Sequence, residues 1–214
     1  MSNINEEYID EYIRNLVPDR NELLTELEKY ADENHVPIIE PEVGQFIKTI
    51  IRTKRPKRVL ELGTAIGYSG IHILESSDSI EQLVTMEIRE DIANIALENF
   101  KKANLEDKVE LMVGDACELL PTVDSKFDLI FIDAAKGQYN LFFKEAQRLL
   151  NDDGIIICDN ILFRGMVATD ELVIRRKKTI VKRLRTFLKD IMETEGYTSS
   201  ILPIGDGIAI ILKG

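Results

Sequence analysis

The chain has 214 residues, 38 of them acidic and 27 basic, and carries a net charge of −11 at pH 7. This length suits a single domain that can bury a full hydrophobic core, and an apolar share of 44% excludes a disordered chain. Two cysteines, Cys117 and Cys158, are too few for a disulfide framework, and no Cys-x-x-Cys pair is present for zinc or redox chemistry. The acidic total argues at first against a nucleic-acid partner.

The sequence contains no candidate for a targeting or membrane segment. Residues 1–7 lack the basic and apolar regions of a secretory signal. The longest wholly apolar run, residues 208–212, is far shorter than the ~20 residues that span a bilayer. We therefore expect a cytoplasmic protein that makes no membrane contact.

The first 55 residues are predicted to be helical, because apolar side chains recur there at helical spacing in three stretches separated by prolines. From residue 58, short apolar runs typical of strands alternate with helix-length segments. Five such runs cover residues 59–62, 82–88, 108–113, 127–133 and 154–159. A long helix then precedes two further runs, 200–202 and 207–212, which a short turn connects.

Five strand–helix units in series require a mostly parallel sheet with helices on both faces. The closing pair of strands favours an antiparallel edge. The sequence thus predicts one domain, residues 1–214, with a doubly wound, mostly parallel seven-stranded α/β core at 56–214. Residues 1–55 would form a helical N-terminal cap.

The turn after the first strand is rich in glycine and is followed by a helix. Gly63 and Gly67 would let the backbone approach a ligand at the start of that helix, although their spacing differs from the Gly-x-Gly-x-x-Gly of dinucleotide sites. Glu87, at the end of the second strand, is suited to binding ribose hydroxyls. These features predict a cofactor that contains a nucleoside. Alternatively, the glycines only pack the helix against the strand.

This loop resembles motif I of class I S-adenosylmethionine-dependent methyltransferases. Glu61, directly before Leu62 and Gly63, fits a site for the cationic aminoacyl group of that cofactor and would repel a pyrophosphate. The loop therefore favours a methyltransferase over a nicotinamide-dependent oxidoreductase, which is the alternative from another enzyme class.

Oxygen-bearing side chains follow two further strands. Asp133 ends the fourth strand, and Asp159 and Asn160 end the fifth. Two carboxylates and an amide form a hard, all-oxygen ligand set that suits Mg²⁺. Each residue could instead cap a turn or a helix. Lys136, three residues after Asp133, is a candidate general base, or else a solvated lysine at the start of a helix.

Together these segments resemble the metal-dependent O-methyltransferase family that includes catechol and caffeoyl-coenzyme A O-methyltransferases. The resemblance covers residues 35–214 and is carried by residues 43–46, 60–69, 114–116, 133–136, 159–160 and 202–207. It implies a Rossmann-like fold, S-adenosylmethionine as cofactor, and Mg²⁺ or Mn²⁺ held by Asp133, Asp159 and Asn160. It also implies that Lys136 takes the proton of the acceptor hydroxyl, with Asp133 beside it in the catalytic centre.

The resemblance assigns the remaining cofactor contacts as well. Glu87 would bind the ribose, and Asp115 and Ala116 would flank the adenine. The methionine part would be surrounded by Ile39, Glu61, Gly63 and Ser69, with Asp133 facing the cofactor too. The extra N-terminal helices would cover a partner subunit in a homodimer.

The acceptor needs two neighbouring oxygens that chelate a metal, as in catechols or in 5-hydroxyuridine. The chain has Ala135 where small-catechol enzymes have a bulky aromatic residue, and it has no tryptophan, so an open pocket is expected. Residues 171–190 carry eight basic and two acidic side chains, a local charge of +6 against −17 elsewhere. These could form a solvated helix face or contact RNA phosphates; the predicted RNA contacts are Arg164, Arg175, Lys178, Lys182 and Arg185.

The sequence therefore predicts a methyltransferase that forms 5-methoxyuridine at the wobble base of tRNA, since its closest resemblance is to bacterial tRNA 5-hydroxyuridine methyltransferases. An unstacked base of an anticodon loop can enter such a pocket. Methylation of small catechol-like or caffeoyl-type phenols is the alternative in the same class. A catalytically silent RNA-binding module is disfavoured because the residues expected to act in catalysis are present.

Overall fold

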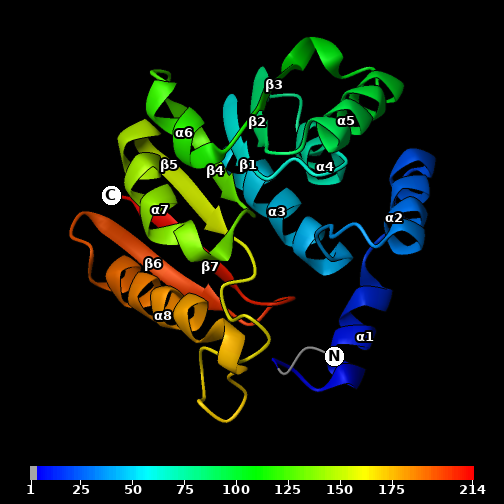
Figure 1. Cartoon of the computed structure of the whole chain (residues 1–214). Helices are drawn as coiled ribbons and strands as arrows, with labels where there is room; N and C mark the ends of the chain where they lie inside the picture. Colours follow the sequence, from blue (N-terminus) through cyan, green and yellow to red (C-terminus); the bar gives the residue numbers. More distant parts are fainter. Residues whose placement is uncertain (1–3) are drawn as a thin grey trace.

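The structure of the protein, a computed structural model, describes residues 4–214. The first three residues of the segment considered for a secretory signal lie outside this range. Figure 1 shows one central sheet, made of β1 (Arg58–Leu62), β2 (Gln82–Glu87), β3 (Val109–Val113), β4 (Phe127–Ile132), β5 (Leu150–Cys158), β6 (Tyr197–Leu202) and β7 (Ile208–Lys213). Their order across the sheet is β3-β2-β1-β4-β5-β7-β6.

The first five strands pair in parallel, and β7 runs antiparallel to both β5 and β6. The helices are α1 (Glu7–Leu16), α2 (Glu22–Asn34), α3 (Pro41–Lys54), α4 (Tyr68–Ser76), α5 (Glu90–Lys102), α6 (Ala116–Leu119), α7 (Tyr139–Leu149) and α8 (Lys178–Glu193). The predicted doubly wound fold with an antiparallel edge is confirmed. The strand order reverses between β1 and β4, which is where ligands bind in such sheets.

Each face of the sheet is covered by an apolar helix layer. Along β1, Val59 packs on one side with α3, α4 and α5, while Leu60 and Leu62 pack on the other with α7 and α8. Because successive strand residues point to opposite faces, a strand covered on both sides must be apolar throughout. Glu61 is the exception, a fully buried carboxyl in the central strand.

Two strands begin earlier than the sequence predicted. β5 begins at Leu150, which pairs with Phe127, whereas Ile155 pairs with Leu129, so residues 151–154 bulge out of the ladder. Their Asn-Asp-Asp-Gly composition is typical of a turn and hid the start of the strand. β6 begins at Tyr197 rather than residue 200 because this edge strand is mostly exposed and has a weak apolar signal.

Charged pairs attach the N-terminal helices to the core. Arg14 of α1 makes two hydrogen bonds of 3.1 and 2.9 Å to Glu42 of α3. Arg20, between α1 and α2, does the same with Glu28 of α2, which also accepts a 2.6 Å hydrogen bond from the Tyr68 hydroxyl at the start of α4. Such bidentate pairs fix geometry as well as charge. In residues 4–214 no helix is long and apolar enough to cross a membrane.

Candidate active site

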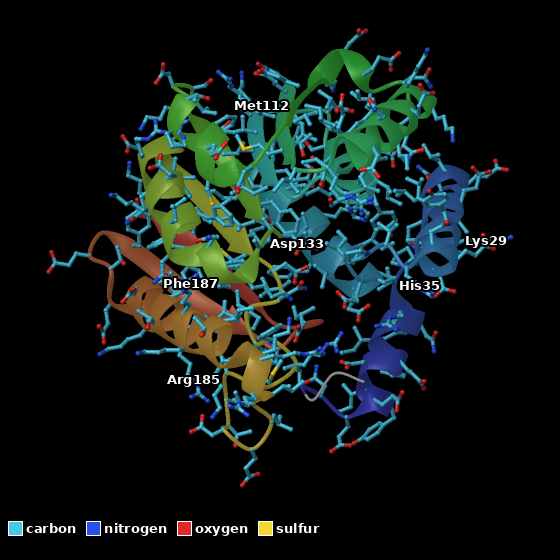
Figure 2. All side chains as sticks on the ribbon, in the orientation of Figure 1. Lys29, His35, Met112, Asp133, Arg185 and Phe187 are labelled. Atoms are coloured by element: carbon cyan, nitrogen blue, oxygen red, sulfur yellow. The ribbon has the colours of Figure 1, made fainter. Side chains whose placement is uncertain are left out.

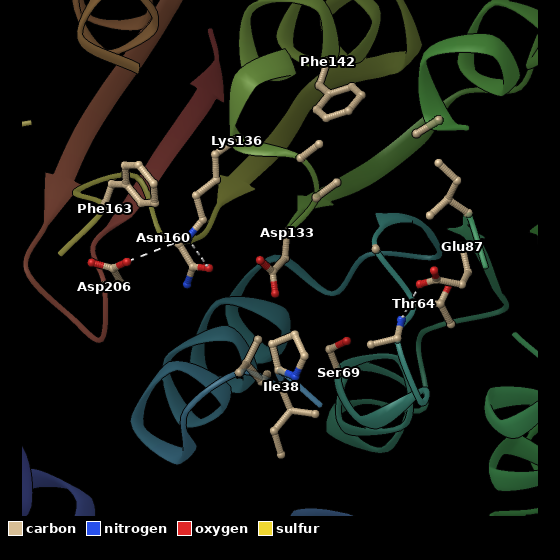
Figure 3. A pocket seen from close by; sticks show the side chains of 18 of the residues that line it. Ile38, Thr64, Ser69, Glu87, Asp133, Lys136, Phe142, Asn160, Phe163 and Asp206 are labelled. Carbon is tan, nitrogen blue, oxygen red and sulfur yellow. Dashed lines mark hydrogen bonds and ion pairs between the residues drawn. The ribbon is translucent and has the colours of Figure 1, made fainter. Parts of the chain in front are cut away.

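A cavity of about 940 Å³ opens at the carboxyl ends of the parallel strands. Its walls come from the loops after β1 to β5, from residues 37–40 of the N-terminal cap, and from residues between β5 and α8. Figure 3 shows that Glu87 and Ser69 lie toward one end of this cavity and Lys136 and Asn160 toward the other, with Asp133 between them. The site is therefore divided into two halves by the end of β4.

The glycine loop after β1 follows the wall of the first half. Gly63 has φ 103°, and a Cβ at this position would collide with the carbonyl oxygen of Asp133, so only glycine permits this approach to β4. Gly67, with φ 84°, precedes α4 and packs against Phe100 of α5. Gly67 does not line the cavity, which fits the packing role that the sequence left open.

Two carboxylates at the edge of this first half accept hydrogen bonds from the protein backbone. The carboxylate of Glu87 accepts hydrogen bonds of 3.0 Å from the backbone N–H groups of Ala65 and Arg89. Asp115 caps α6 by accepting from the N–H of Cys117 at 2.8 Å. These bonds hold both carboxylates at the cavity edge.

Glu61 lies behind the wall of the cavity. Its two carboxyl oxygens accept hydrogen bonds of 2.5 and 2.6 Å from the hydroxyls of Ser69 and Thr85. Burial raises the pKa of Glu61 to about 7 despite these bonds. The side chain that borders the cavity here is Ser69, whose hydroxyl is hydrogen-bonded to Glu61.

Most of the predicted cofactor residues line one continuous cavity. Those that do are Ile39, Gly63, Ser69, Glu87, Asp115, Ala116 and Asp133. They come from five separate segments of the chain, which only the fold brings together.

The three predicted metal ligands meet where β4 and β5 end. Asp159 is fully buried, and its Oδ1 accepts a 2.6 Å hydrogen bond from the N–H of Asn160, while its Oδ2 has no hydrogen-bond partner. Burial and the neighbouring charge of Asp133 raise the pKa of Asp159, and burial raises that of Asp133. Two carboxyls side by side in a desolvated site need a positive charge if both are to ionise.

Lys136 lies directly beside this set. Its Nζ donates a 2.9 Å hydrogen bond to Oδ1 of Asn160, lies 3.7 Å from Oδ2 of Asp206, and sits 5.2 Å from the centre of the Phe163 ring (Figure 3). Lys136 begins a single 3₁₀ turn before α7 rather than the helix itself. Its contacts hold the amine at the cavity, and the alternative of a solvated lysine at the start of a helix is not supported.

The sequence missed several residues of this half. Asp206 and Phe163 line the cavity and contact Lys136, and Glu40 lies nearby with a pKa that burial raises. Tyr139 supports the floor, since its hydroxyl donates a 2.7 Å hydrogen bond to the backbone oxygen of Asp159. None of them follows a parallel strand directly, the position that singled out the predicted residues.

The basic residues near α8 divide into different groups. Arg185 is bound internally, to Asp170 at 2.7 Å and to the carbonyl of Val167 at 2.9 Å, so its guanidinium supports the preceding loop. Arg175 lies in a 3₁₀ turn before α8, so it does not share a helix with Lys178, Lys182 and Arg185 of α8 (Figure 2). The residues of this group that line the cavity are Arg164, Arg176 and Lys177, and only the first was predicted to contact RNA.

Known proteins resemble this chain along nearly its whole length. Residues 15–214 match the model of the O-methyltransferase family. The chain is 32% identical to the catechol O-methyltransferase of Niastella koreensis over 167 residues, which are 75% of this chain and 76% of that protein. It is 28% identical to the caffeoyl-CoA O-methyltransferase of Stellaria longipes, over 94% of this chain and 88% of that one.

Solved structures agree with this result. The O-methyltransferase of Bacillus cereus, solved in complex with S-adenosylhomocysteine, is 28% identical with a TM-score of 0.85 over 97% of each chain. TomG of Streptomyces achromogenes, solved with S-adenosylmethionine, is 25% identical with a TM-score of 0.84 over 96% of each chain. S-adenosylmethionine, the organic cofactor predicted, is thereby confirmed, and the oxidoreductase alternative is excluded. The chain belongs to the O-methyltransferase family and is an S-adenosylmethionine-dependent O-methyltransferase.

Proposed function

We propose that this enzyme methylates a hydroxyl of a small aromatic acceptor with two neighbouring oxygens, of the catechol or caffeoyl type. The observation that carries the proposal is the buried, unpartnered Oδ2 of Asp159 beside Asp133, Asn160 and Lys136. The catechol and caffeoyl-CoA enzymes among its relatives support the same acceptor class. This reverses the order of the two acceptors predicted from the sequence, where tRNA came first.

A divalent cation fits this cluster. No three histidine, cysteine, aspartate or glutamate side chains among residues 4–214 are grouped to hold a metal, but the proposed set has two carboxylates and one amide. Asp133, Asp159 and Asn160 supply oxygen atoms, which Mg²⁺ and Mn²⁺ prefer. An orphaned carboxylate oxygen inside a protein is costly, and a cation would compensate it.

The chemistry needs a deprotonated oxygen aligned with a methyl donor. S-adenosylmethionine supplies the electrophilic methyl group, and a bound cation would lower the pKa of the acceptor hydroxyl and fix its direction. Lys136 Nζ, held at the cluster, accepts the hydroxyl proton. Ser69 and Glu87 orient the cofactor at the opposite end of the cavity, which converts the reaction into one between aligned groups.

The outer part of the cavity favours an acceptor with an anionic group. Arg176 and Lys177 line it beside Phe163, and the Lys177 Nζ lies 5.7 Å from the centre of that ring. An aromatic acceptor could stack on Phe163 while a carboxylate or phosphate meets the two cations.

The test measures methyl transfer from labelled S-adenosylmethionine, with and without Mg²⁺, to catechol, caffeate, caffeoyl-CoA and a phenol with one hydroxyl. We expect Mg²⁺-dependent transfer to the three vicinal diols and none to the monophenol. Equal transfer to the monophenol would contradict chelation of the acceptor.

Methylation of 5-hydroxyuridine in tRNA is the second candidate. The observation that favours it is the +6 charge of residues 171–190 on an acidic molecule, because such a patch can bind RNA phosphates. Unmodified tRNA bearing 5-hydroxyuridine belongs in the same assay. Transfer to tRNA that exceeds transfer to every phenol, and that falls in Lys178→Glu/Lys182→Glu, would make RNA the acceptor.

We also propose that the enzyme is a homodimer. Tyr8, Tyr12 and Leu16 expose at least 65% of their surface on one side of α1, and the acidic residues of that helix complement the basic residues near α8 of a second copy. Light scattering should give the mass of a dimer for the wild type and of a monomer for Tyr12→Glu; a monomeric wild type would contradict this.

A further inference from the structure

The loop after β5 has an unusual backbone. Asn160, Phe163 and Arg164 have φ of 55°, 48° and 56°, and Gly165 has φ 78°. Non-glycine residues enter this left-handed region only against a steric penalty, and such a conformation persists only where its surroundings enforce it. Since this loop carries Asn160, whatever enforces it also fixes the position of a proposed metal ligand.

The turn between β6 and β7 enforces this conformation. The backbone oxygens of Asp206 and Gly207 accept hydrogen bonds of 2.9 and 3.0 Å from the N–H groups of Leu162 and Ile161. Gly207 has φ 90°, and a Cβ there would collide with Leu162. The Asp206 carboxylate adds a third bond, accepting from the N–H of Arg164 through Oδ1 at 2.5 Å.

The second oxygen of the same carboxylate faces the candidate base. Oδ2 of Asp206 lies 3.7 Å from Lys136 Nζ, and the Asp206 side chain is 16% exposed. Lys136 also contacts Asn160 and Phe163 of the left-handed loop. One carboxylate thus lies between the loop and the lysine, and Figure 3 shows Asp206 and Asn160 both joined to the lysine amine.

Several charged groups surround Lys136 and Asp206, and more than one carboxylate could attract the amine. Glu40, Asp133 and Asp159 are the other acidic groups that face Asp206 or Lys136, and Arg164 is the other cation near Asp206. Asp133 and Asp159 would also attract the amine toward the metal set. Asp159 holds the start of the loop through the N–H of Asn160, whereas Asp206 holds its later part through the N–H of Arg164 and therefore pulls the amine toward a fixed point.

We propose that Asp206 is a positioning residue that couples the left-handed loop at residues 160–165 to Lys136, holding the amine beside Asn160 in the orientation needed for proton removal. This inference rests on the proposed function, in which Lys136 is the base.

The test separates charge from backbone support. In Asp206→Asn, the amide oxygen still accepts from the N–H of Arg164, but the charge facing Lys136 is lost. We expect kcat for the vicinal diol to fall roughly 10–100-fold, as for other residues that orient a catalytic group. The KM for S-adenosylmethionine and the affinity for S-adenosylhomocysteine should stay within two-fold. Asp206→Glu, which keeps the charge, should recover part of kcat, and Asp152→Asn, at an exposed ion pair with Lys213, is the matched control.

A double variant distinguishes positioning of Lys136 by Asp206 from a purely structural role of Asp206. If Asp206 acts by positioning Lys136, Asp206→Asn should lower kcat no further in a Lys136→Ala background, because the amine that it would position is absent. An equal loss of kcat in both backgrounds would overturn the proposal. So would an unchanged kcat in Asp206→Asn, or a loss of S-adenosylhomocysteine binding that matches the loss of kcat.

A structural readout keeps this inference distinct from the proposed function. Crystals of metal-free Asp206→Asn should show Lys136 Nζ displaced from Asn160 Oδ1 relative to the wild type. An unmoved lysine would overturn the positioning role. Failure of the wild type to methylate any diol would overturn the proposed acceptor, while the position of the lysine would still test the coupling.

Discussion

The two halves of the cavity differ in how their buried polar groups are satisfied. On the cofactor side, Glu61 and Glu87 have protein donors for both of their carboxyl oxygens. On the acceptor side, Asp159 keeps an oxygen without any partner, and the pKa of both Asp133 and Asp159 is raised. In the first half the folded chain supplies a hydrogen-bond donor to each of these carboxyl oxygens, whereas in the second half one buried carboxyl oxygen has no donor. The proposed cation would add a positive charge to the second half beside that of Lys136.

Asp159→Ala should have the largest effect, because it removes the orphaned carboxylate that would hold the cation. Turnover should fall below detection. We expect Mg²⁺ to raise the midpoint of thermal unfolding of the wild type by binding its folded state, and this rise should be absent in the variant. Calorimetry should find S-adenosylhomocysteine binding nearly unchanged, as in the exposed control Asp124→Ala. A comparable loss of cofactor binding would show that the two halves are not independent.

Lys136→Ala comes next. Removal of a general base lowers kcat by about 10²–10⁴-fold, and here both metal and cofactor binding should survive. Steady-state kinetics beside Lys144→Ala, an exposed lysine of α7, would measure the difference. A fall of less than ten-fold would assign the proton to another acceptor.

Glu61→Gln tests whether the buried carboxyl of Glu61 lowers the free energy of unfolding at neutral pH, although both of its oxygens accept hydrogen bonds. Because the pKa of Glu61 is raised from 4.5 to about 7, the folded protein binds more protons than the unfolded chain between these values. Its contribution to stability is present at pH 4.5 and is lost as pH rises through 7, a change of about 3 kcal/mol. Denaturant unfolding should show Glu61→Gln gaining stability over the wild type from pH 5.5 to 8, unlike the exposed control Glu118→Gln. No pH-dependent gain would mean that Ser69 and Thr85 keep the carboxylate ionised.

Tyr139→Phe should have the smallest effect. It removes the 2.7 Å hydrogen bond to the backbone of Asp159, a loss of about 1 kcal/mol in unfolding free energy and roughly ten-fold in turnover through the displaced ligand. Thermal unfolding and kinetics should be compared with Tyr30→Phe on the outer side of α2. If turnover is unchanged, the end of β5 needs no support from α7.

The sequence predicted the parts of the fold and site that follow from short-range patterns. Apolar runs alternating with helices determine the parallel sheet, and residues directly after strands, such as Asp133 and Asp159, share one edge because parallel strands end together. The start of β5 was missed because turn-like residues 151–154 bulge within a ladder that Leu150 begins. Asp206 lies in the segment 202–207 that carries the family resemblance, but its place after an antiparallel edge strand gave no reason to expect it beside Lys136. Phe163 was missed because no such segment and no strand end marks it.

The chain alone thus determined the enzyme family, the cofactor loop and the cluster of Asp133, Lys136, Asp159 and Asn160, since each depends on residue type at fixed local spacing. Only the tertiary structure decided that Glu61 lies behind Ser69, that Arg185 is held by the loop before α8, and that Asp206 meets Lys136, 70 positions earlier in the chain. Partnerships of this kind depend on distances between segments, and those distances exist only once the sheet has formed and its helices have packed.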